Sequence, residues 1–419
     1  MSTEKICDSQ KCTLCMACVN SCPTKAIQVT ADEFGFEKLS IEQEKCIDCG
    51  LCSKICKRRD DIPRNHPQKC YAAQMSDFSA LKRSASGGAF QAIAEIILEK
   101  GGICYGAELI HNDNEFEVRH TRVVNLEGLK RILNSKYIPS IIGEIYKQAK
   151  QDLENDNLVL FSGTPCLILG LKAYLGKEYE KLLTVDLVCH GVTATKIFND
   201  YVKEVEKTKR ITIVDYQFRD KSISWGTNYC YSYYNSDSSN QIKIRHCPRE
   251  ESSYMTHYLR GHIFRENCYS CSLSNTLRVS DFTLGDYWEI EVEHPEFVTK
   301  MKPSIILRKG VSCVLANTEQ ALKYMPDLRS KMTFYEVSLE TIVKHNGNLQ
   351  LPSKKGKGRA EFLNTYKANG YSLIEKQFQA NMGKKIYIYR IKNALKAHLP
   401  DRVRIWIYNT PRLRRILFH

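Results

Sequence analysis

The first residues with the types and spacing of a chemical site are two runs of cysteines. The first run is Cys12-x2-Cys15-x2-Cys18-x3-Cys22-Pro23, and the second is Cys46-x2-Cys49-x2-Cys52-x3-Cys56. Three thiolates at this spacing wrap a tight loop around three corners of a 4Fe-4S cube, and the fourth crosses to a second cube. Zinc sites usually come as two separated cysteine pairs, so the runs favour iron–sulfur clusters.

This spacing is typical of bacterial two-cluster ferredoxins. We expect one 4Fe-4S cluster on Cys12, Cys15, Cys18 and Cys56, and the other on Cys46, Cys49, Cys52 and Cys22. Lys57 stands where the second run would usually have a proline, which we expect to alter a turn and to leave the ligation unchanged. Cys7 lies outside the pattern and is predicted to be a spare thiol.

Several short patterns follow residue 80 in a definite order. They are Ser84-Ala85-Ser86-Gly87-Gly88, Ser162-Gly163-Thr164-Pro165-Cys166, Cys189-His190-Gly191-Val192, Phe218-Arg219-Asp220-Lys221 with Trp225-Gly226, and Cys268-x2-Cys271 followed by Asp281-x-Thr283-x-Gly285-Asp286-Tyr287-Trp288. In this order they resemble the coenzyme F420 hydrogenase/dehydrogenase beta-subunit family over roughly residues 75–340, preceded by a fused ferredoxin domain. The resemblance implies FAD, one further 4Fe-4S cluster and electron transfer to a hydride-accepting substrate. Bacterial relatives also occur among surface-polysaccharide genes.

The first of these patterns is a candidate phosphate site. Small residues before a helix let the backbone approach an anion, and the helix N-terminus supplies N–H donors. A flavin pyrophosphate would fit there, whereas the alternative is a plain N-cap with a glycine turn. With the resemblance, the predicted flavin-binding residues are Ser84, Ser86, Gly87, Gly88, Gly163, Thr164, Arg219, Lys221 and Asp286. An ordinary surface pair remains the alternative for Arg219 and Lys221.

A third 4Fe-4S cluster is predicted on Cys166, Cys189, Cys268 and Cys271. The last two form an adjacent ligand pair, and the first two each follow a buried-strand run, where open α/β folds gather functional groups. The alternatives are a zinc site from the same four residues, or a role for Cys166 and Cys189 as small buried hydrophobes. Cys230 and Cys247 are the reserve ligand candidates.

The predicted catalytic residues are His190 and Lys221. The pKa of a histidine lies near neutral, so His190 can exchange a proton with a substrate during reduction; a structural histidine is the alternative. Trp225 and Trp288 either stack on a flavin or fill the core. The roles of Asp281 and Asp286 stay open.

Alternating strands and helices must position these residues. Strands are expected at 103–109, 158–161, 183–188, 211–218 and 227–234, and helices at 88–100, 142–153 and 194–207. We therefore predict an α+β ferredoxin-like domain over 1–62, a linker over 63–81, an α/β flavin and iron–sulfur domain over 82–340, and a basic helical C-terminal extension over 350–419.

Composition narrows the class of protein. The chain has 419 residues, 43% hydrophobic and 26% charged, which excludes wholesale disorder. No secretory signal or transmembrane run is apparent, so we expect a cytoplasmic protein in which 18 reduced cysteines serve as metal or redox groups. Of the net charge of +14, residues 381–419 carry +9, with ten Lys/Arg and one acid. The body is therefore not a basic nucleic-acid surface, and no nucleic-acid partner is expected.

These observations predict an iron–sulfur flavoprotein oxidoreductase. It would exchange electrons with a partner protein and pass hydride to a small-molecule or glycan-linked substrate, in surface-polysaccharide metabolism; flavin converts between one- and two-electron chemistry. The alternative is a non-catalytic electron-transfer or redox-sensing subunit.

On a helix, Ile388, Ile391 and Leu395 share one face of the tail, with basic residues beside them. That pattern predicts either peripheral contact with the inner face of the membrane or a helix packed on protein.

Overall fold

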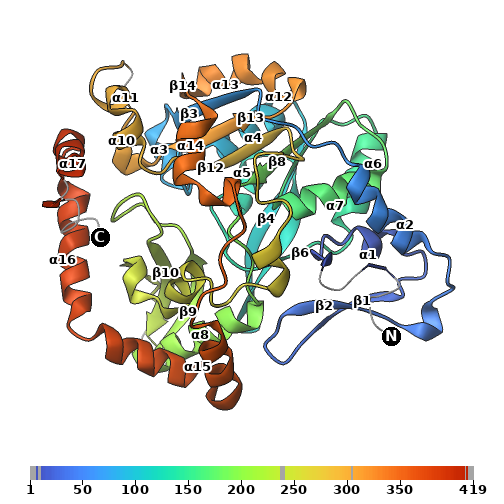
Figure 1. Ribbon diagram of the computed structural model, residues 1–419, viewed down its shortest axis with the longest axis horizontal. Coiled ribbons are helices and arrows are strands. Elements are labelled where there is room, and N and C mark those ends of the chain that lie inside the picture. Colours follow the sequence, from blue (N-terminus) through green and yellow to red (C-terminus); the bar gives the residue numbers. More distant parts are fainter. Residues whose placement is uncertain (1–5, 8–10, 236–240, 303–304, 411, 414–419) are drawn as a thin grey trace.

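The computed structural model describes residues 6–7, 11–235, 241–302, 305–410 and 412–413. Figure 1 shows a small N-terminal part on the right, a body around a nine-stranded sheet, and C-terminal helices along the opposite side. The N-terminal part contains α1 (Ala17–Ser21), β1 (Ile27–Ala31), β2 (Glu37–Ile41) and α2 (Leu51–Arg58), with 3-10 turns at Gln43–Lys45 and Arg59–Asp61. Its two strands pair in an antiparallel hairpin, with Ile27 opposite Ile41.

The large sheet mixes parallel and antiparallel strands. In spatial order the strands are β14 (Met332–Glu336), β3 (Lys69–Met75), β13 (Ser312–Ala316), β12 (Phe282–Asp286), β8 (Leu182–Leu187), β7 (Val159–Ser162), β4 (Ile103–Asn112), β5 (Glu115–Val123) and β6 (Ser140–Ile141). The central four, β12, β8, β7 and β4, run parallel. Their carboxyl ends therefore meet at one edge of the sheet, which is where open α/β sheets place ligands.

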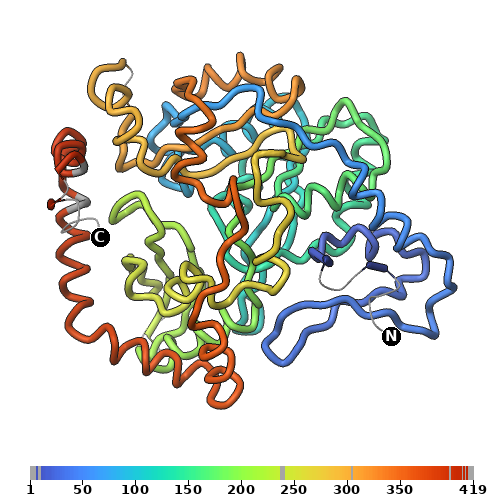
Figure 2. Tube along the Cα trace, in the orientation of Figure 1, coloured from blue at the N-terminus to red at the C-terminus, as the bar shows by residue number. Residues whose placement is uncertain are grey.

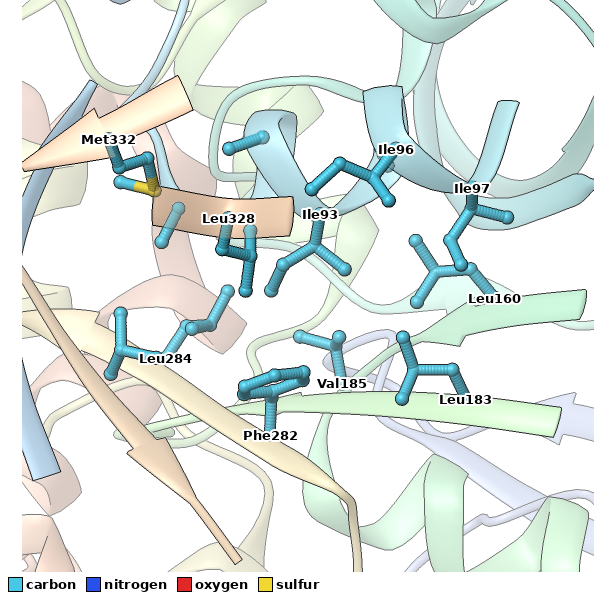
Figure 3. Close-up of a cluster of buried hydrophobic side chains, with 14 of the residues drawn as sticks. Ile93, Ile96, Ile97, Leu160, Leu183, Val185, Phe282, Leu284, Leu328 and Met332 are labelled. Carbon is cyan, nitrogen blue, oxygen red and sulfur yellow. The ribbon is translucent and has the colours of Figure 1, made fainter. Parts of the chain in front are cut away.

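One face of the sheet is covered by α3 (Phe78–Leu81), α4 (Ala89–Glu99), α5 (Leu126–Ile132), α12 (Glu319–Lys323) and α13 (Met325–Lys331). The apolar residues of α4 recur at helical spacing, so a single stripe faces the strands. Figure 3 shows this contact, in which Ile93, Ile96 and Ile97 of α4 and Leu328 of α13 lie over side chains of the central strands. The strand residues are Leu160, Leu183, Val185 and Phe282.

The other face is covered by α6 (Ile145–Glu154), α7 (Pro165–Leu175) and the N-terminal part. One hydrophobic cluster joins Leu14, Ile27 and Leu39 of the N-terminal part with Phe161 and Ile168 of the body. Gly170 allows the closest approach, because a Cβ there would overlap the carbonyl oxygen of Cys15. The N-terminal part is thus packed directly on the body.

A second, antiparallel sheet lies beside the first. Its order is β11 (Lys243–Cys247), β10 (Tyr229–Asn235) and β9 (Ile211–Gln217), and α8 (Thr195–Lys209), α9 (Ser253–Leu259) and α15 (Arg359–Met382) pack with it. Aromatic rings fill the interior, among them Phe198, Tyr216, Tyr254 and Tyr371. Helix α15 belongs to this core, so only the helices after it form a separate tail.

The tail consists of α16 (Lys385–His398) and α17 (Asp401–Tyr408), which Figure 2 shows as a red column along the side of the molecule opposite the N-terminal part. The Arg390 guanidinium pairs with both carboxylate oxygens of Glu251, at 2.6 and 2.9 Å, and the Asp401 carboxylate accepts from the Leu307 backbone N–H at 3.2 Å.

Short helices α10 (Ile290–Glu293), α11 (Pro295–Thr299) and α14 (Leu339–His345) complete the body, with 3-10 turns at Arg249–Glu251, Glu266–Ser270, Leu307–Lys309 and Gly347–Leu349. Within the described ranges, no helix is long and apolar enough to cross a membrane.

The expected elements from residue 88 to 234 are present within a few residues of their predicted ends. The predicted linker over 63–81 is wrong. It contains β3, which pairs with β13 and β14 in the large sheet, and α3. The α/β body therefore begins near Lys69 and not at residue 82.

Candidate functional site

Seven of the eight thiols in the two cysteine runs lie near thiols that their spacing predicts as partners. Burial raises the pKa of Cys15, and the nearby Cys12 and Cys56 raise it further. Burial and the neighbours Cys15, Cys12 and Cys56 do the same for Cys18. Because such effects require proximity, these four residues form one neighbourhood, which we name the first cysteine set. Burial raises the pKa of Cys52, with Cys49 and Cys22 as further thiol neighbours, so these residues belong to a second set.

Cys46 and Cys7 are the two remaining thiols of the N-terminal part. The Cys46 thiol donates to the Asp48 carboxylate over 3.8 Å. Cys7, predicted to be a spare thiol outside the pattern, hydrogen-bonds with two thiols of the first set: it lowers the pKa of Cys12 and that of Cys56 to about 6. It therefore lies against the first set.

A third cysteine set lines a small cavity of about 40 Å³ at the carboxyl edge of the parallel strands. Cys166 follows β7 and Cys189 follows β8, while Cys268 and Cys271 come from the 3-10 turn beyond α9 and its C-cap. Burial raises the pKa of Cys189, and Cys268 and Cys166 raise it further. The structure thus brings together the four residues predicted from sequence.

Two polar side chains test whether a 4Fe-4S cluster fits this set. The Nε of Arg265 and the Oγ1 of Thr13 line the small cavity, are buried, and have no hydrogen-bond partner among the described residues. Buried polar groups are normally satisfied, so such orphans call for a missing partner. Four thiols with two buried polar atoms that lack partners suit a sulfur-rich cluster that accepts hydrogen bonds.

Arg265 also links the first and third cysteine sets. Its Nη2 donates to the Thr13 carbonyl at 2.7 Å, and its charge acts to lower the pKa of Cys12 and opposes the effect of burial on the pKa of Cys166 and Cys268. Tyr146 makes a second link, because its hydroxyl reaches the carbonyl oxygens of Cys15, at 2.9 Å, and Leu167, at 2.8 Å. The two sets therefore lie on either side of a short, rigid contact.

A large cavity of about 630 Å³ adjoins the small one and shares Cys166, Cys189, His190 and Arg265 with it. Helix α4 begins at this cavity with Gly88 as N-cap, and α7 begins there with Thr164 as N-cap; neither has a side-chain cap hydrogen bond. The first N–H groups of a helix have no intrahelical partner. The start of α4 is therefore suited to hold an anion. Helix α7 begins with Pro165, which has no N–H, and the Leu167 N–H donates to the Thr164 carbonyl at 2.9 Å. Of the residues predicted for the flavin, those in the lining are Ser84, Ser86, Gly88, Gly163, Thr164, Arg219 and Asp286.

Gly87 and Lys221, both predicted to hold the flavin, are not among the residues that line this cavity. A Cβ at Gly87 would overlap the Ala73 carbonyl oxygen, so this glycine serves packing against β3. The Lys221 Nζ donates to the carbonyl oxygens of Ser86, at 2.7 Å, and Lys309, at 2.9 Å, and burial lowers its pKa to about 7. Lys221 thus positions the Ser86 turn and does not contact the cavity.

Arg219 and Asp286 form a buried network at the cavity wall. The guanidinium pairs with both carboxylate oxygens, at 2.8 and 3.0 Å, and donates to the Ala85 carbonyl at 3.1 Å. Burial alone would raise the pKa of Asp286, but the ion pair with Arg219 outweighs it and holds the pKa below its usual value. Asp286 also accepts from Trp225 Nε1 at 2.8 Å, and Trp225 stacks on Trp288 at 5.1 Å. These contacts among the chain's own residues hold the cavity wall in place.

Two lining residues escaped the sequence analysis. The Lys136 Nζ donates to the Leu133 and Asn134 carbonyls, and burial lowers its pKa to about 7. His120 donates from Nε2 to the Ser162 carbonyl, and burial lowers its pKa to about 4. Neither stands in a recognisable motif. The predicted His190 does line both cavities, and burial lowers its pKa too.

Comparisons with known proteins agree with this geometry. Residues 156–341 match the family model for the C terminus of the beta subunit of coenzyme F420 hydrogenase/dehydrogenase, and residues 11–59 match that of a 4Fe-4S dicluster domain. Residues 156–341, a little under half of the chain, therefore match the C-terminal domain of this beta-subunit family. The family resemblance read from the sequence is therefore confirmed, and so is an iron–sulfur domain of ferredoxin type at the N-terminus.

Two individual proteins are also similar over part of the chain. A segment of 51 residues, 12% of this chain, is 43% identical to the indolepyruvate oxidoreductase subunit IorA of Archaeoglobus fulgidus and spans 7% of that protein. The F420-reducing [NiFe] hydrogenase complex of Methanosarcina barkeri contains a chain that is 13% identical, with 68% of this chain and 89% of that one covered and a TM-score of 0.43. A TM-score below 0.5 does not establish a shared fold. The family matches define an iron–sulfur electron-transfer protein related to oxidoreductase components.

Proposed function

We propose that the protein is an iron–sulfur flavoprotein oxidoreductase. Electrons pass between a ferredoxin-type partner protein and an organic hydride acceptor, with three 4Fe-4S clusters and FAD as carriers. One observation carries this proposal: the cysteine-lined small cavity shares a wall with a cavity large enough for a cofactor and a substrate. An electron carrier in the first would lie directly beside a reaction site in the second.

The order of the cysteine sets supports a path through the protein. In the second set Cys49 is exposed, and Ile47 beside it is 65% exposed, which offers an entry point for a partner protein. The second set is close to the first, because Cys52 also acts on Cys18, and the first reaches the third through Arg265. We assign Cys22, Cys46, Cys49 and Cys52 to the outer cluster.

FAD is assigned to the large cavity. The start of α4 offers N–H groups and a positive dipole end to a pyrophosphate, and the stacked Trp225 and Trp288 offer an aromatic surface to a ring system. When bound there, a flavin supplies the exchange between single electrons and hydride. The chain's own residues would bind its phosphates and exclude water.

Protons for the reduced product would come from His190 and Lys136. Both line the large cavity, and a lysine whose pKa lies near 7 exchanges protons readily at neutral pH. His190 lies where the two cavities meet, so it would stand next to both carriers. The hydride acceptor is proposed to be a small molecule or a glycan-linked substrate, in surface-polysaccharide metabolism; only the family resemblance supports the glycan.

An acidic side chain at the start of α4 tests the flavin assignment. Ala89 is the first residue of α4 and lines the large cavity. Ala89→Asp adds a negative charge, which the helix dipole stabilises but which repels a pyrophosphate. The amount of FAD released on denaturation should therefore fall at least tenfold. Gln320→Asp makes the same change in the first turn of α12, away from the cavity, and should keep its FAD. Equal FAD in both variants would refute the placement.

The alternative is a non-catalytic electron-transfer or redox-sensing subunit serving another enzyme. A pure relay needs neither flavin nor a cavity of this size. Wild-type protein that retains its iron but binds no flavin would favour that alternative. The large cavity is the observation that favours the enzyme.

For the tail, we propose peripheral contact with an anionic membrane at the inner face of the cell. One side of α16 and α17 packs on the body, with Ile405 and Ile407 buried. The opposite side exposes an apolar stripe of Tyr387, Ile388, Ile391, Leu395 and Trp406, each more than half exposed. Lys384, Lys385 and Arg402 beside this stripe are exposed as well. Apolar side chains rimmed by cations suit anionic headgroups. Residues 414–419 of the predicted tail lie outside the described residues.

Flotation with vesicles tests this contact. The full chain should float with phosphatidylglycerol vesicles at low salt, and Ile388→Ser with Ile391→Ser should reduce the floating fraction at least fivefold, because both side chains point away from the body. Lys323→Ser on α12, which removes an exposed cation elsewhere, is the control. Equal flotation of all three proteins would leave the tail as a packing element or a surface for a protein partner.

A further inference from the structure

A second candidate metal site lies outside the cysteine sets, in the small sheet. The carboxylate of Asp220, the thiol of Cys230 and the imidazole of His246 place one ligand atom each within 4.8 Å of one another. The His246 Nδ1 and the Asp220 Oδ2 are 2.8 Å apart. These three residues come from three separate segments of the chain.

The fold brings them together through strand pairing. Cys230 on β10 stands opposite His246 on β11, and on its other side it stands opposite Gln217 on β9. The chain leaves β9 and returns to the sheet at Asp220, whose backbone N–H donates to the Asn228 carbonyl at 2.7 Å. The convergence is thus built into the register of the sheet.

The cluster combines a carboxylate, a thiol and an imidazole that differ in burial. Asp220 and Cys230 are both buried, whereas His246 is 44% exposed. The Oδ1 of Asp220 accepts from the backbone N–H of Ser222, at 3.0 Å, and from its hydroxyl, at 2.8 Å, so Oδ2 faces the histidine. Burial and the Asp220 charge raise the pKa of the Cys230 thiol to about 12. A divalent cation would neutralise one carboxylate and one thiolate.

We propose that Asp220, Cys230 and His246 bind one zinc ion. Nitrogen, oxygen and sulfur ligands of this kind are those that zinc takes, and three protein ligands leave the fourth tetrahedral position to water. Zinc binding displaces the thiol proton to solvent, and the exposed imidazole is the entry side. Ser222 holds the carboxylate in place, as outer partners of zinc ligands do.

The position of the ion gives it a structural role. Asp220 stands between Arg219, which forms the cavity wall, and Lys221, which holds the Ser86 turn. Zinc at Asp220 would tie this segment to β10 and β11. It therefore stabilises the wall of the large cavity from behind and takes no part in electron transfer.

Metal analysis of the full chain, purified anaerobically with its clusters after growth with added zinc, tests the proposal. We expect about one zinc per chain, with zinc K-edge absorption showing one sulfur and otherwise nitrogen or oxygen neighbours. His246→Ala, at an exposed position, and Cys230→Ser should each lower zinc at least tenfold and leave iron unchanged. Cys247→Ser changes the next residue of β11, a thiol outside the ligand group, and should keep the zinc.

Three results would overturn the proposal. The first is less than a tenth of a zinc per wild-type chain after incubation with equimolar zinc and desalting. The second is zinc that is retained equally in His246→Ala and Cys230→Ser. The third is a zinc environment of four sulfurs, which would place the ion in a cysteine set instead.

Discussion

The N-terminal part and the body build their sites in opposite ways. In the N-terminal part, the eight cysteines of the two runs fall within residues 12–56. This part has two short strands, and most of its buried apolar residues pack in clusters shared with the body. The large cavity draws on turns from distant segments, and the Arg219–Asp286 pair and the packed sheet hold its wall. We therefore expect bound metal to stabilise the N-terminal part, whereas packing and buried polar contacts stabilise the body.

Removal of iron is the change with the largest expected effect. Small domains with little core depend on bound metal for folding. Oxidative chelation should therefore let the amides of residues 11–59 exchange within minutes, while those of β7, β8 and α4 stay protected. Hydrogen exchange with mass spectrometry measures both regions in one sample. Protection that survives in residues 11–59 would show that packing on α7 is enough to hold this part.

Loss of the buried ion pair should have the next largest effect, and only in the body. Arg219→Ala leaves Asp286 buried without its cation, which costs about 3–5 kcal/mol of the free energy of unfolding. Iron in the N-terminal part should stay constant. Arg58→Ala removes a partly exposed guanidinium that donates to the Ala173 carbonyl at 3.0 Å, and should cost about 1 kcal/mol. Urea unfolding followed by tryptophan fluorescence gives both values, and similar losses would contradict the contrast.

A smaller effect is expected from Lys136, through pH. Burial lowers its pKa from 10.5 to about 7, so between pH 7 and pH 10 the unfolded chain binds a proton that the folded chain does not. Stability contributed by this group therefore rises with pH in that window. Lys136→Met should be more stable than wild type at pH 6.5, and the difference should shrink by pH 9.5. A difference that is the same at both pH values would place Lys136 in water.

Sequence reasoning succeeded where the signal is local. Cysteine spacing predicted the iron–sulfur domain, and the apolar runs of β7 and β8 predicted buried strands of an α/β core. The turns after those strands placed Cys166 and Cys189 at one sheet edge, since carboxyl ends of parallel strands meet there.

It failed where partners lie far along the chain. The sequence around β3 predicts a linker, because Pro63 and Pro67 precede the strand and its partners β13 and β14 follow more than 200 residues later. Gly87 faces Ala73 and not the cavity, which only the packing of β3 decides. Lys136 and His120 carry no motif, so their position in the cavity depends on the fold alone.

The central claim is that a third 4Fe-4S cluster lies on Cys166, Cys189, Cys268 and Cys271 beside the large cavity. Iron analysis of anaerobically purified protein tests it most directly. Wild type should contain about 12 iron atoms per chain, and Cys268→Ser with Cys271→Ser should lower this by about 4 while the signals of the two N-terminal clusters persist. Cys104→Ser, a buried thiol of β4 outside all three sets, should keep the full content. Iron that is unchanged in the double variant would contradict the claim.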